Sequence, residues 1–89
     1  MSDRRIERKI LFVEDEVIVA LAYERLLRKH GYSILQASSG ESAIEAVRKD
    51  DSIDLILMDI DLGSGIDGID ASVVILATRS LPIVFLTGH

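Results

Sequence analysis

The stretch Lys9-Ile-Leu-Phe-Val-Glu-Asp15 carries the strongest indication of the fold. Its apolar, β-favouring residues run continuously and then stop at two carboxylates, which is typical of a strand buried on both faces of a parallel sheet. A second run of this kind, Ile53-Asp-Leu-Ile-Leu-Met58, leads into Asp59 and Asp61. The sequence therefore predicts two buried strands that each end in acidic side chains.

Strand and helix patterns alternate along the whole chain. We expect further strands over 32–37 and 82–86, and helices over 16–30, from about 39 to 50 or 51, and over 68–79. Alternating strands and helices with short links predict an α/β fold, a parallel sheet with helices on both faces.

The helix ends and faces can be predicted from local patterns. Ser38 with Glu41 reads as a capping box for the second helix. Asp67 reads as the cap of the third. The spacing of the first helix predicts an inward face that consists of Ile18, Leu21, Ala22, Arg25 and Leu26.

Length and composition exclude several classes of protein. The 89 residues suffice for one small domain, and the absence of cysteine excludes disulfides and thiolate metal sites. No long basic stretch offers a grip on nucleic acid, and no apolar run approaches the roughly 18 residues that cross a membrane. Residues 1–9 lack the apolar core of a signal peptide. We expect a cytoplasmic protein that contacts neither nucleic acid nor membrane.

The net charge of −5 lies entirely in the second half of the chain. Residues 51–89 hold six aspartates against Arg79 as the single basic residue. A solvated acidic face explains most of this charge. We expect four aspartates to be solvated: Asp50, Asp51, Asp54 and Asp70.

Acidic side chains at the strand ends suggest a different role from these solvated aspartates. In open parallel sheets, ligands bind beyond the carboxyl ends of the strands. If the first and third strands are neighbours, Glu14 and Asp15 meet Asp59 and Asp61 in one cleft, and Thr87 ends the next strand. Such carboxylates repel one another unless a cation neutralises them, and oxygen ligands on a rigid rim suit Mg²⁺. An aspartate beside that ion can attack phosphorus and form an acyl phosphate.

Four ordered motifs carry a family resemblance: Ile10-Leu-Phe-Val-Glu14-Asp15-Glu16, Asp54-Leu-Ile-Leu-Met-Asp59, Asp67-Gly68-Ile69 and Pro82-Ile-Val-Phe-Leu-Thr87-Gly88. From Lys9 to the last residue, the chain resembles the receiver domain of two-component response regulators. The resemblance implies a flavodoxin-like, doubly wound parallel sheet with strands in the order 2-1-3-4.

The resemblance also implies roles for the acidic residues. Asp59 would be the phosphoacceptor and become an aspartyl phosphate. Asp15 and Asp59 would bind Mg²⁺ directly, Glu14 would bind through water, and Asp61 would contribute its backbone carbonyl.

Further roles concern the phosphoryl group and its source. Thr87 would be the switch hydroxyl, and the backbone N–H groups of Ile60 and Gly88 would hold phosphoryl oxygens. The phosphoryl group would come from a sensor histidine kinase or a phosphotransfer protein. Such a domain assists its own phosphorylation and dephosphorylation, but it is a signalling switch rather than an enzyme.

Two departures from the family pattern stand out. In the loop 60–66, glycine replaces a usual proline and the loop is one residue longer. The chain also stops at His89, without the final helix, lysine-bearing strand and helix of a full receiver. We therefore expect a charged extension over 1–8 and a C-terminally incomplete receiver over 9–89. The fourth strand would be an exposed apolar edge that could pair in a homodimer.

The sequence pattern has three alternative interpretations. The first is a receiver-like interaction module that is never phosphorylated. The second is a phosphohydrolase of the haloacid dehalogenase type, because Asp59-Ile-Asp61 looks like its paired aspartates, although that pair belongs on a first strand. The third is dinucleotide binding by the G-x-G-x-x-G of residues 63–68, which we reject because nearby aspartates would repel a pyrophosphate.

Overall fold

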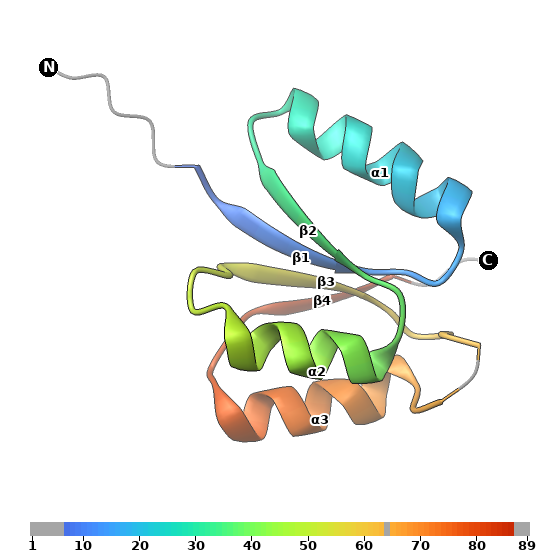
Figure 1. Ribbon diagram of the computed structural model, residues 1–89, viewed down its shortest axis with the longest axis vertical. Coiled ribbons are helices and arrows are strands. Elements are labelled where there is room, and N and C mark those ends of the chain that lie inside the picture. Colours follow the sequence, from blue (N-terminus) through green and yellow to red (C-terminus); the bar gives the residue numbers. More distant parts are fainter. Residues whose placement is uncertain (1–6, 64, 87–89) are drawn as a thin grey trace, which may run out of the picture.

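The computed structural model describes residues 7–63 and 65–86, in which strands and helices alternate as predicted (Figure 1). The strands are β1 (Lys9–Val13), β2 (Ser33–Ala37), β3 (Leu55–Asp59) and β4 (Ile83–Leu86). The helices are α1 (Val17–Lys29), α2 (Gly40–Lys49) and α3 (Gly68–Thr78). Strand ends differ from the prediction by one or two residues. No helix in the described part of the chain has the length and apolar character needed to span a bilayer.

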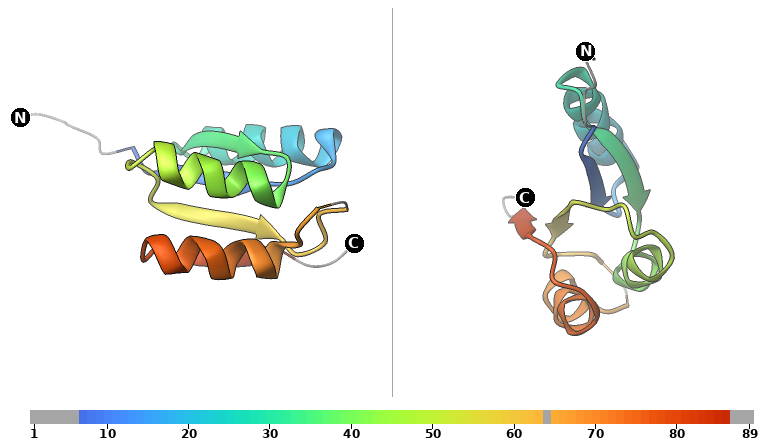
Figure 2. Two further views of the ribbon diagram at one scale, coloured as in Figure 1. Left: turned by 60° about the horizontal axis from the view of Figure 1, so that its bottom comes forward. Right: turned by 90° about the vertical axis from the view of Figure 1, so that its left-hand side faces the viewer.

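The four strands form one parallel sheet in the order β2-β1-β3-β4, which confirms the predicted fold. In its register, Val13 lies between Ala37 and Met58, and Asp59 lies beside Leu86. The strands therefore end together at one edge of the sheet. Helix α1 covers one face, and α2 and α3 lie side by side on the other (Figures 1 and 2).

Apolar residues of β1 are buried on both faces, as its continuous apolar run predicted, whereas β3 is fully buried on the face of α2 and α3 and half-buried, at Leu55 and Leu57, on the face of α1. Leu11, Val13, Ile56 and Met58 belong to the core under α2 and α3. Phe12 belongs with Ile10, Ala20 and Ile34 to the smaller core under α1. Burial of these side chains is the main force that holds the sheet and helices together.

The inward face predicted for α1 is wrong. The residues that face the sheet are Ala20, which is buried, Leu27, and Tyr23, whose ring lies 5.3 Å from that of Phe12. Ile18 is 77% exposed, and Leu26 is 51% exposed. The other members of the predicted face, Leu21, Ala22 and Arg25, are also exposed. Because α1 carries apolar residues all round, the spacing of these residues is compatible with either an Ile18 face or an Ala20 face toward the sheet. The small Ala20 side chain is the one that contacts the sheet, which selects its face.

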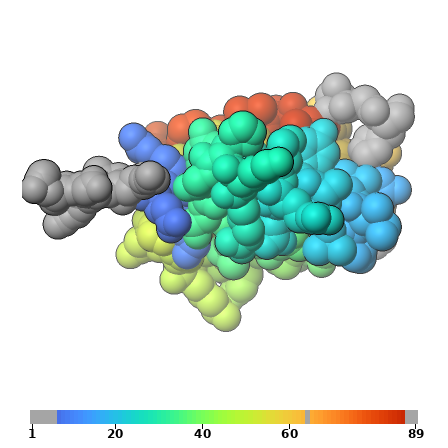
Figure 3. All heavy atoms as spheres, turned by 90° about the horizontal axis from the view of Figure 1, so that it is seen from above, coloured from blue at the N-terminus to red at the C-terminus, as the bar shows by residue number. Residues whose placement is uncertain are grey.

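Figure 3 looks onto this side of the molecule, where α1 (blue to cyan) covers part of the surface and orange-red C-terminal chain remains visible beside it.

The cap of α2 differs from the prediction by one residue. Ser39, not Ser38, is the N-cap: the Ser42 N–H donates to Ser39 Oγ at 3.0 Å, and the Ser39 N–H donates to Ser42 Oγ at 3.1 Å. Serine at the third helical position thus completes the capping box, and Glu41 is not part of it. The predicted cap of α3 is confirmed, because Asp67 accepts the Asp70 N–H at 2.8 Å.

The acidic residues at the opposite end of the sheet are not all free in solvent. Asp50 is half-buried and forms an ion pair with Lys9, so the expectation of simple solvation is wrong for Asp50. Asp54 is exposed but accepts the backbone N–H of Lys9 at 2.8 Å. Both aspartates thereby connect the α2–β3 segment to the start of β1.

Candidate functional site

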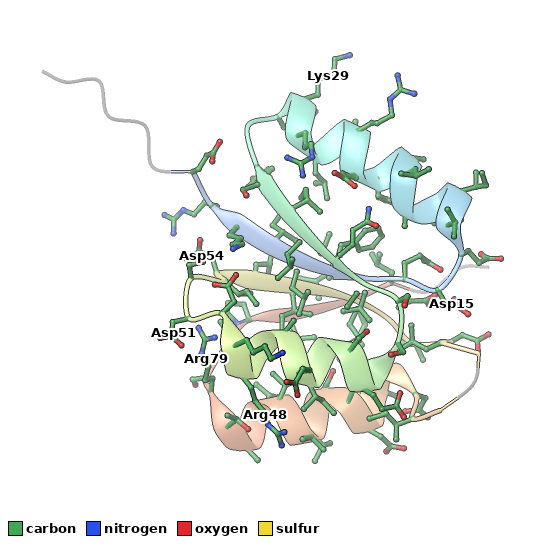
Figure 4. All side chains as sticks on the ribbon, viewed as in Figure 1. Asp15, Lys29, Arg48, Asp51, Asp54 and Arg79 are labelled. Atoms are coloured by element: carbon green, nitrogen blue, oxygen red, sulfur yellow. The ribbon has the colours of Figure 1, made fainter. Side chains whose placement is uncertain are left out.

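Three predicted site residues meet where β1 and β3 end. Glu14, Asp15 and Asp59 each offer a carboxylate oxygen within 4.8 Å of the others. Asp59 is 1% exposed and Glu14 is 5% exposed, whereas Asp15 faces solvent. Figure 4 shows Asp15 at this end of the sheet, with Asp51, Asp54 and Arg79 at the opposite end. Adjacent pairing of β1 with β3 is what brings these acids together, as the prediction required.

The site is electrostatically strained without a cation. The pKa of Glu14 is raised from 4.5 to about 7, mainly by burial and in addition by the neighbouring carboxylates Asp59 and Asp15. The Glu16 N–H, which donates to Glu14 Oε2 at 3.2 Å, opposes this shift of the Glu14 pKa. Crowded carboxylates of this kind favour either a shared proton or a bound cation.

The position of Asp59 is fixed by the chain that follows it. The Asp61 N–H donates to Asp59 Oδ1 at 3.0 Å. The Asp61 side chain is exposed, and the role expected for its backbone carbonyl stays a prediction. Asp15, Glu16, Asp61 and Gly63 line a hollow of about 280 Å³ beside the carboxylates. Hard oxygen donors on a rim that water can reach are the ligand set that suits Mg²⁺, so the residues present fit this ion.

Two glycines let the β3–α3 loop lie against the site. A Cβ on Gly68 would lie 2.2 Å from the Asp59 carbonyl oxygen. Gly63 has a φ of +77°, and a Cβ there would lie 2.7 Å from Asp15 Oδ2. Both glycines belong to the G-x-G-x-x-G stretch that does not fit dinucleotide binding, and the sequence did not predict their proximity to Asp59 and Asp15. The sequence did offer one signal for this proximity, because Gly63 lies within the lengthened loop and Gly68 follows shortly after it.

The other predicted phosphoryl contacts are only partly described. The Ile60 N–H donates to the Leu86 carbonyl oxygen at 3.4 Å, within the β3–β4 pairing. Its role toward phosphoryl oxygens therefore stays a prediction. Thr87 and Gly88 lie outside the described residues.

The topology disfavours a haloacid dehalogenase-type site. The Asp59–Asp61 pair follows β3, the third strand along the chain, rather than the first. Glu14 and Asp15, which that reading leaves without a role, are part of the same cluster. The arrangement can instead concentrate negative charge around one buried aspartate, a setting that suits cation-assisted phosphoryl transfer.

Comparisons with known proteins agree with this geometry. A family model described as the response regulator receiver domain matches residues 10–89. The transcriptional regulatory protein PdtaR of Mycobacterium tuberculosis is 36% identical over 87 residues, which are 97% of this chain and 42% of that protein. The chain thus spans less than half of this curated relative.

Solved structures are also similar. One is the N-terminal domain of a response regulator/sensory box/GGDEF 3-domain protein from Carboxydothermus hydrogenoformans, with a TM-score of 0.88 and 45% identity over 92% of this chain and 66% of that chain. Another is the response regulator TrrA from Thermotoga maritima in complex with Mg(2+)-BeF, with a TM-score of 0.86 and 29% identity over 92% of this chain and 70% of that chain.

Proposed function

This chain belongs to the family of response regulator receiver domains, and from that premise we propose that it accepts a phosphoryl group on Asp59. Receiver domains are signalling switches rather than classical enzymes. The observation that carries the proposal is the convergence of Glu14, Asp15 and Asp59 within 4.8 Å at the end of two neighbouring strands.

The reaction needs an oriented carboxylate oxygen. An Asp59 oxygen attacks the phosphorus of a phosphohistidine, so that an O–P bond forms, the N–P bond breaks and the imidazole leaves with the bonding electrons. The Asp61 N–H, which donates to Asp59 Oδ1, holds the carboxylate in one orientation for this attack. Burial of Asp59 limits the water that could hydrolyse the acyl phosphate.

The acidic cluster would hold Mg²⁺. Asp15 and Asp59 are the proposed direct ligands, Glu14 acts through water, and Asp61 contributes its backbone carbonyl. When bound, the ion offsets the negative charge of the carboxylates and of the incoming phosphoryl oxygens. Thr87 and the backbone N–H groups of Ile60 and Gly88 complete the proposed phosphoryl contacts, and these three roles are inferred from the family alone.

The phosphoryl donor in the cell is proposed to be a sensor histidine kinase or a phosphotransfer protein. One similar solved structure is the anti-anti-sigma factor PhyR from Bartonella quintana, and on this similarity an anti-sigma factor is a second proposed partner. The receiver is proposed to span 9–89 after a charged extension over 1–8. Pairing through the exposed β4 edge, where Val84 is 47% exposed, is the proposed route to a homodimer.

Mass spectrometry of the full chain tests the phosphoacceptor. Incubation with acetyl phosphate and Mg²⁺ should add about 80 Da, the mass of one phosphoryl group. Asp59→Asn should abolish the addition. Asp54→Asn, which removes an exposed carboxylate just before the same strand, should not. Absence of an adduct on the wild-type chain, or its persistence in Asp59→Asn, would favour the interaction module that is never phosphorylated.

A further inference from the structure

Glu41 forms a contact across the fold that its predicted role in a capping box did not suggest. Because Ser39 and Ser42 cap α2 between them, the Glu41 carboxylate is available for another partner. It accepts the Ile66 N–H at 3.2 Å, from a residue 25 positions further along the chain. Both Glu41 carboxylate oxygens also lie 2.8 Å from the point where a Cβ on Gly65 would be. The end of the β3–α3 loop therefore lies directly against the first turn of α2.

The start of the same loop touches the acidic cluster. The Asp61 N–H donates to Asp59 Oδ1 at 3.0 Å. A Cβ added to Gly63 would lie 2.7 Å from Asp15 Oδ2, so the loop backbone passes close to this carboxylate. The Gly68 N–H closes the base of the loop by donating to the Ile60 carbonyl oxygen at 3.1 Å. The position of the loop backbone beside Asp15 and Asp59 thus depends on what holds its far side.

We propose that Glu41 is a positioning residue for the site: by accepting the Ile66 N–H, it holds the loop backbone against Asp15 and Asp59 and so strengthens Mg²⁺ binding. The inference rests on the proposed function, in which the Asp61 carbonyl is a metal ligand. Groups that orient metal ligands from behind commonly change metal affinity when they are removed.

The role of Glu41 is separable from stability of the fold. Glu41 is exposed, and the cap of α2 does not involve it. The Ile66 side chain packs over Gly40, where an added Cβ would lie 2.7 Å from Ile66 Cγ1, so an apolar contact still joins the loop to α2 without Glu41. Loss of the Glu41 carboxylate should loosen the loop backbone and leave the core intact.

The test compares three variants of the full chain. Mg²⁺ affinity is measured by titration calorimetry, and amide hydrogen exchange of Ile66 is measured by NMR. Glu41→Ala should weaken Mg²⁺ binding on the order of tenfold, a typical effect of losing a group behind a metal ligand, and should speed exchange at Ile66. Glu41→Gln keeps an acceptor oxygen without the charge and should preserve both values. Glu45→Ala removes the same charge one turn along α2, at a side chain that pairs only with Arg48 and Lys49 among the described ion pairs, and should also preserve both.

Each contrary result has a definite meaning. If Glu41→Ala binds Mg²⁺ with wild-type affinity, the inference is overturned, whereas the proposed phosphorylation of Asp59 is not affected. Equal weakening in Glu41→Gln or Glu45→Ala assigns the effect to charge rather than to the hydrogen bond and also overturns it. A wild-type chain that does not bind Mg²⁺ overturns the proposed metal site itself, and this inference with it.

Discussion

The guanidinium group of Arg79, directly after α3, donates a hydrogen bond at 2.9 Å to the main-chain carbonyl oxygen of Asp50, directly after α2. It also donates to the carbonyl oxygens of Val47, Asp51 and Ile53. Figure 4 shows Arg79 beside Asp51 at this end of the molecule. Carbonyl groups at the end of a helix lack partners within it, and one planar guanidinium with several N–H groups can satisfy several of them at once.

Replacement of Arg79 should therefore destabilise the fold. We expect Arg79→Ala to lower the free energy of unfolding by about 2 kcal/mol, the scale of hydrogen bonds that involve a charged group. Arg79→Lys should recover only part of this loss, because an ammonium group cannot span several carbonyls in a fixed plane. Urea unfolding measures the effect. The control is Arg48→Ala, an exposed arginine with one ion pair at 3.9 Å, and an equal loss in both alanine variants would contradict the role of Arg79.

Asp50 should make stability depend on acid pH. The Lys9 ammonium and the Ser52 hydroxyl and N–H hold the pKa of Asp50 well below its ordinary value of 3.8. A carboxylate with a lowered pKa stabilises the fold at pH values above its ordinary pKa. This stabilisation is lost as the pH falls below the ordinary pKa and toward the lowered one. Wild-type protein should thus begin to lose its advantage over Asp50→Asn below about pH 4, and the loss should continue as the pH is lowered further. Thermal unfolding across this range measures the change. Asp51→Asn, at the exposed neighbour, should show no such convergence with the wild type.

Glu14 should have the opposite pH dependence in metal-free protein. Its pKa is raised from 4.5 to about 7 by burial and by the charges of Asp59 and Asp15. Because this pKa is raised, protonated Glu14 makes its full contribution to the free energy of unfolding below pH 4.5. This contribution is lost as the pH rises through about 7. We expect the free energy of unfolding to fall from pH 5 to pH 8 without Mg²⁺, and saturating Mg²⁺ to reverse the fall because the ion replaces the proton.

Glu14→Gln provides the control for this pH effect. The variant should be more stable than the wild type at pH 8 without Mg²⁺, because no buried charge forms, yet it should bind Mg²⁺ more weakly. Thermal unfolding at the two pH values, with and without the ion, checks both statements. An unchanged pH dependence in Glu14→Gln would assign the titration to another group.

The convergence of Glu14 and Asp59 could be predicted from the sequence because local patterns place each residue at a strand end and the family resemblance implies that the two strands are neighbours. Each residue ends an apolar run, and parallel strands in a doubly wound sheet place such ends at one edge. The cap at Asp67 could be predicted from a local pattern alone, since its partner Asp70 is three residues away. Local spacing, however, could not separate Ser38 from Ser39 as the cap of α2, because either serine can accept an N–H from the first turn.

Contacts between distant segments were beyond the reach of local patterns. The hydrogen bond from Ile66 to Glu41 depends on how a glycine-rich loop turns. The ion pair of Lys9 with Asp50 joins residues 41 positions apart. On α1, the choice between an Ala20 face and an Ile18 face depends on close packing over Phe12 rather than on hydrophobicity, because the spacing of apolar residues is compatible with both.

Gly63 offers a last test, because a second glycine of the chain isolates its contact with Asp15. Gly63 has a φ of +77° and Gly31 has a φ of +92°, so alanine at either position carries the cost of a left-handed backbone, about 1 kcal/mol. A Cβ on Gly31 meets nothing within 4 Å, whereas a Cβ on Gly63 would lie 2.7 Å from Asp15 Oδ2. Both variants should therefore lose similar stability in urea unfolding, but only Gly63→Ala should weaken Mg²⁺ binding, because it displaces the Asp15 carboxylate. Equal Mg²⁺ affinity in the two variants would mean that the loop can move away from Asp15 without cost, and that the contact does not shape the metal site.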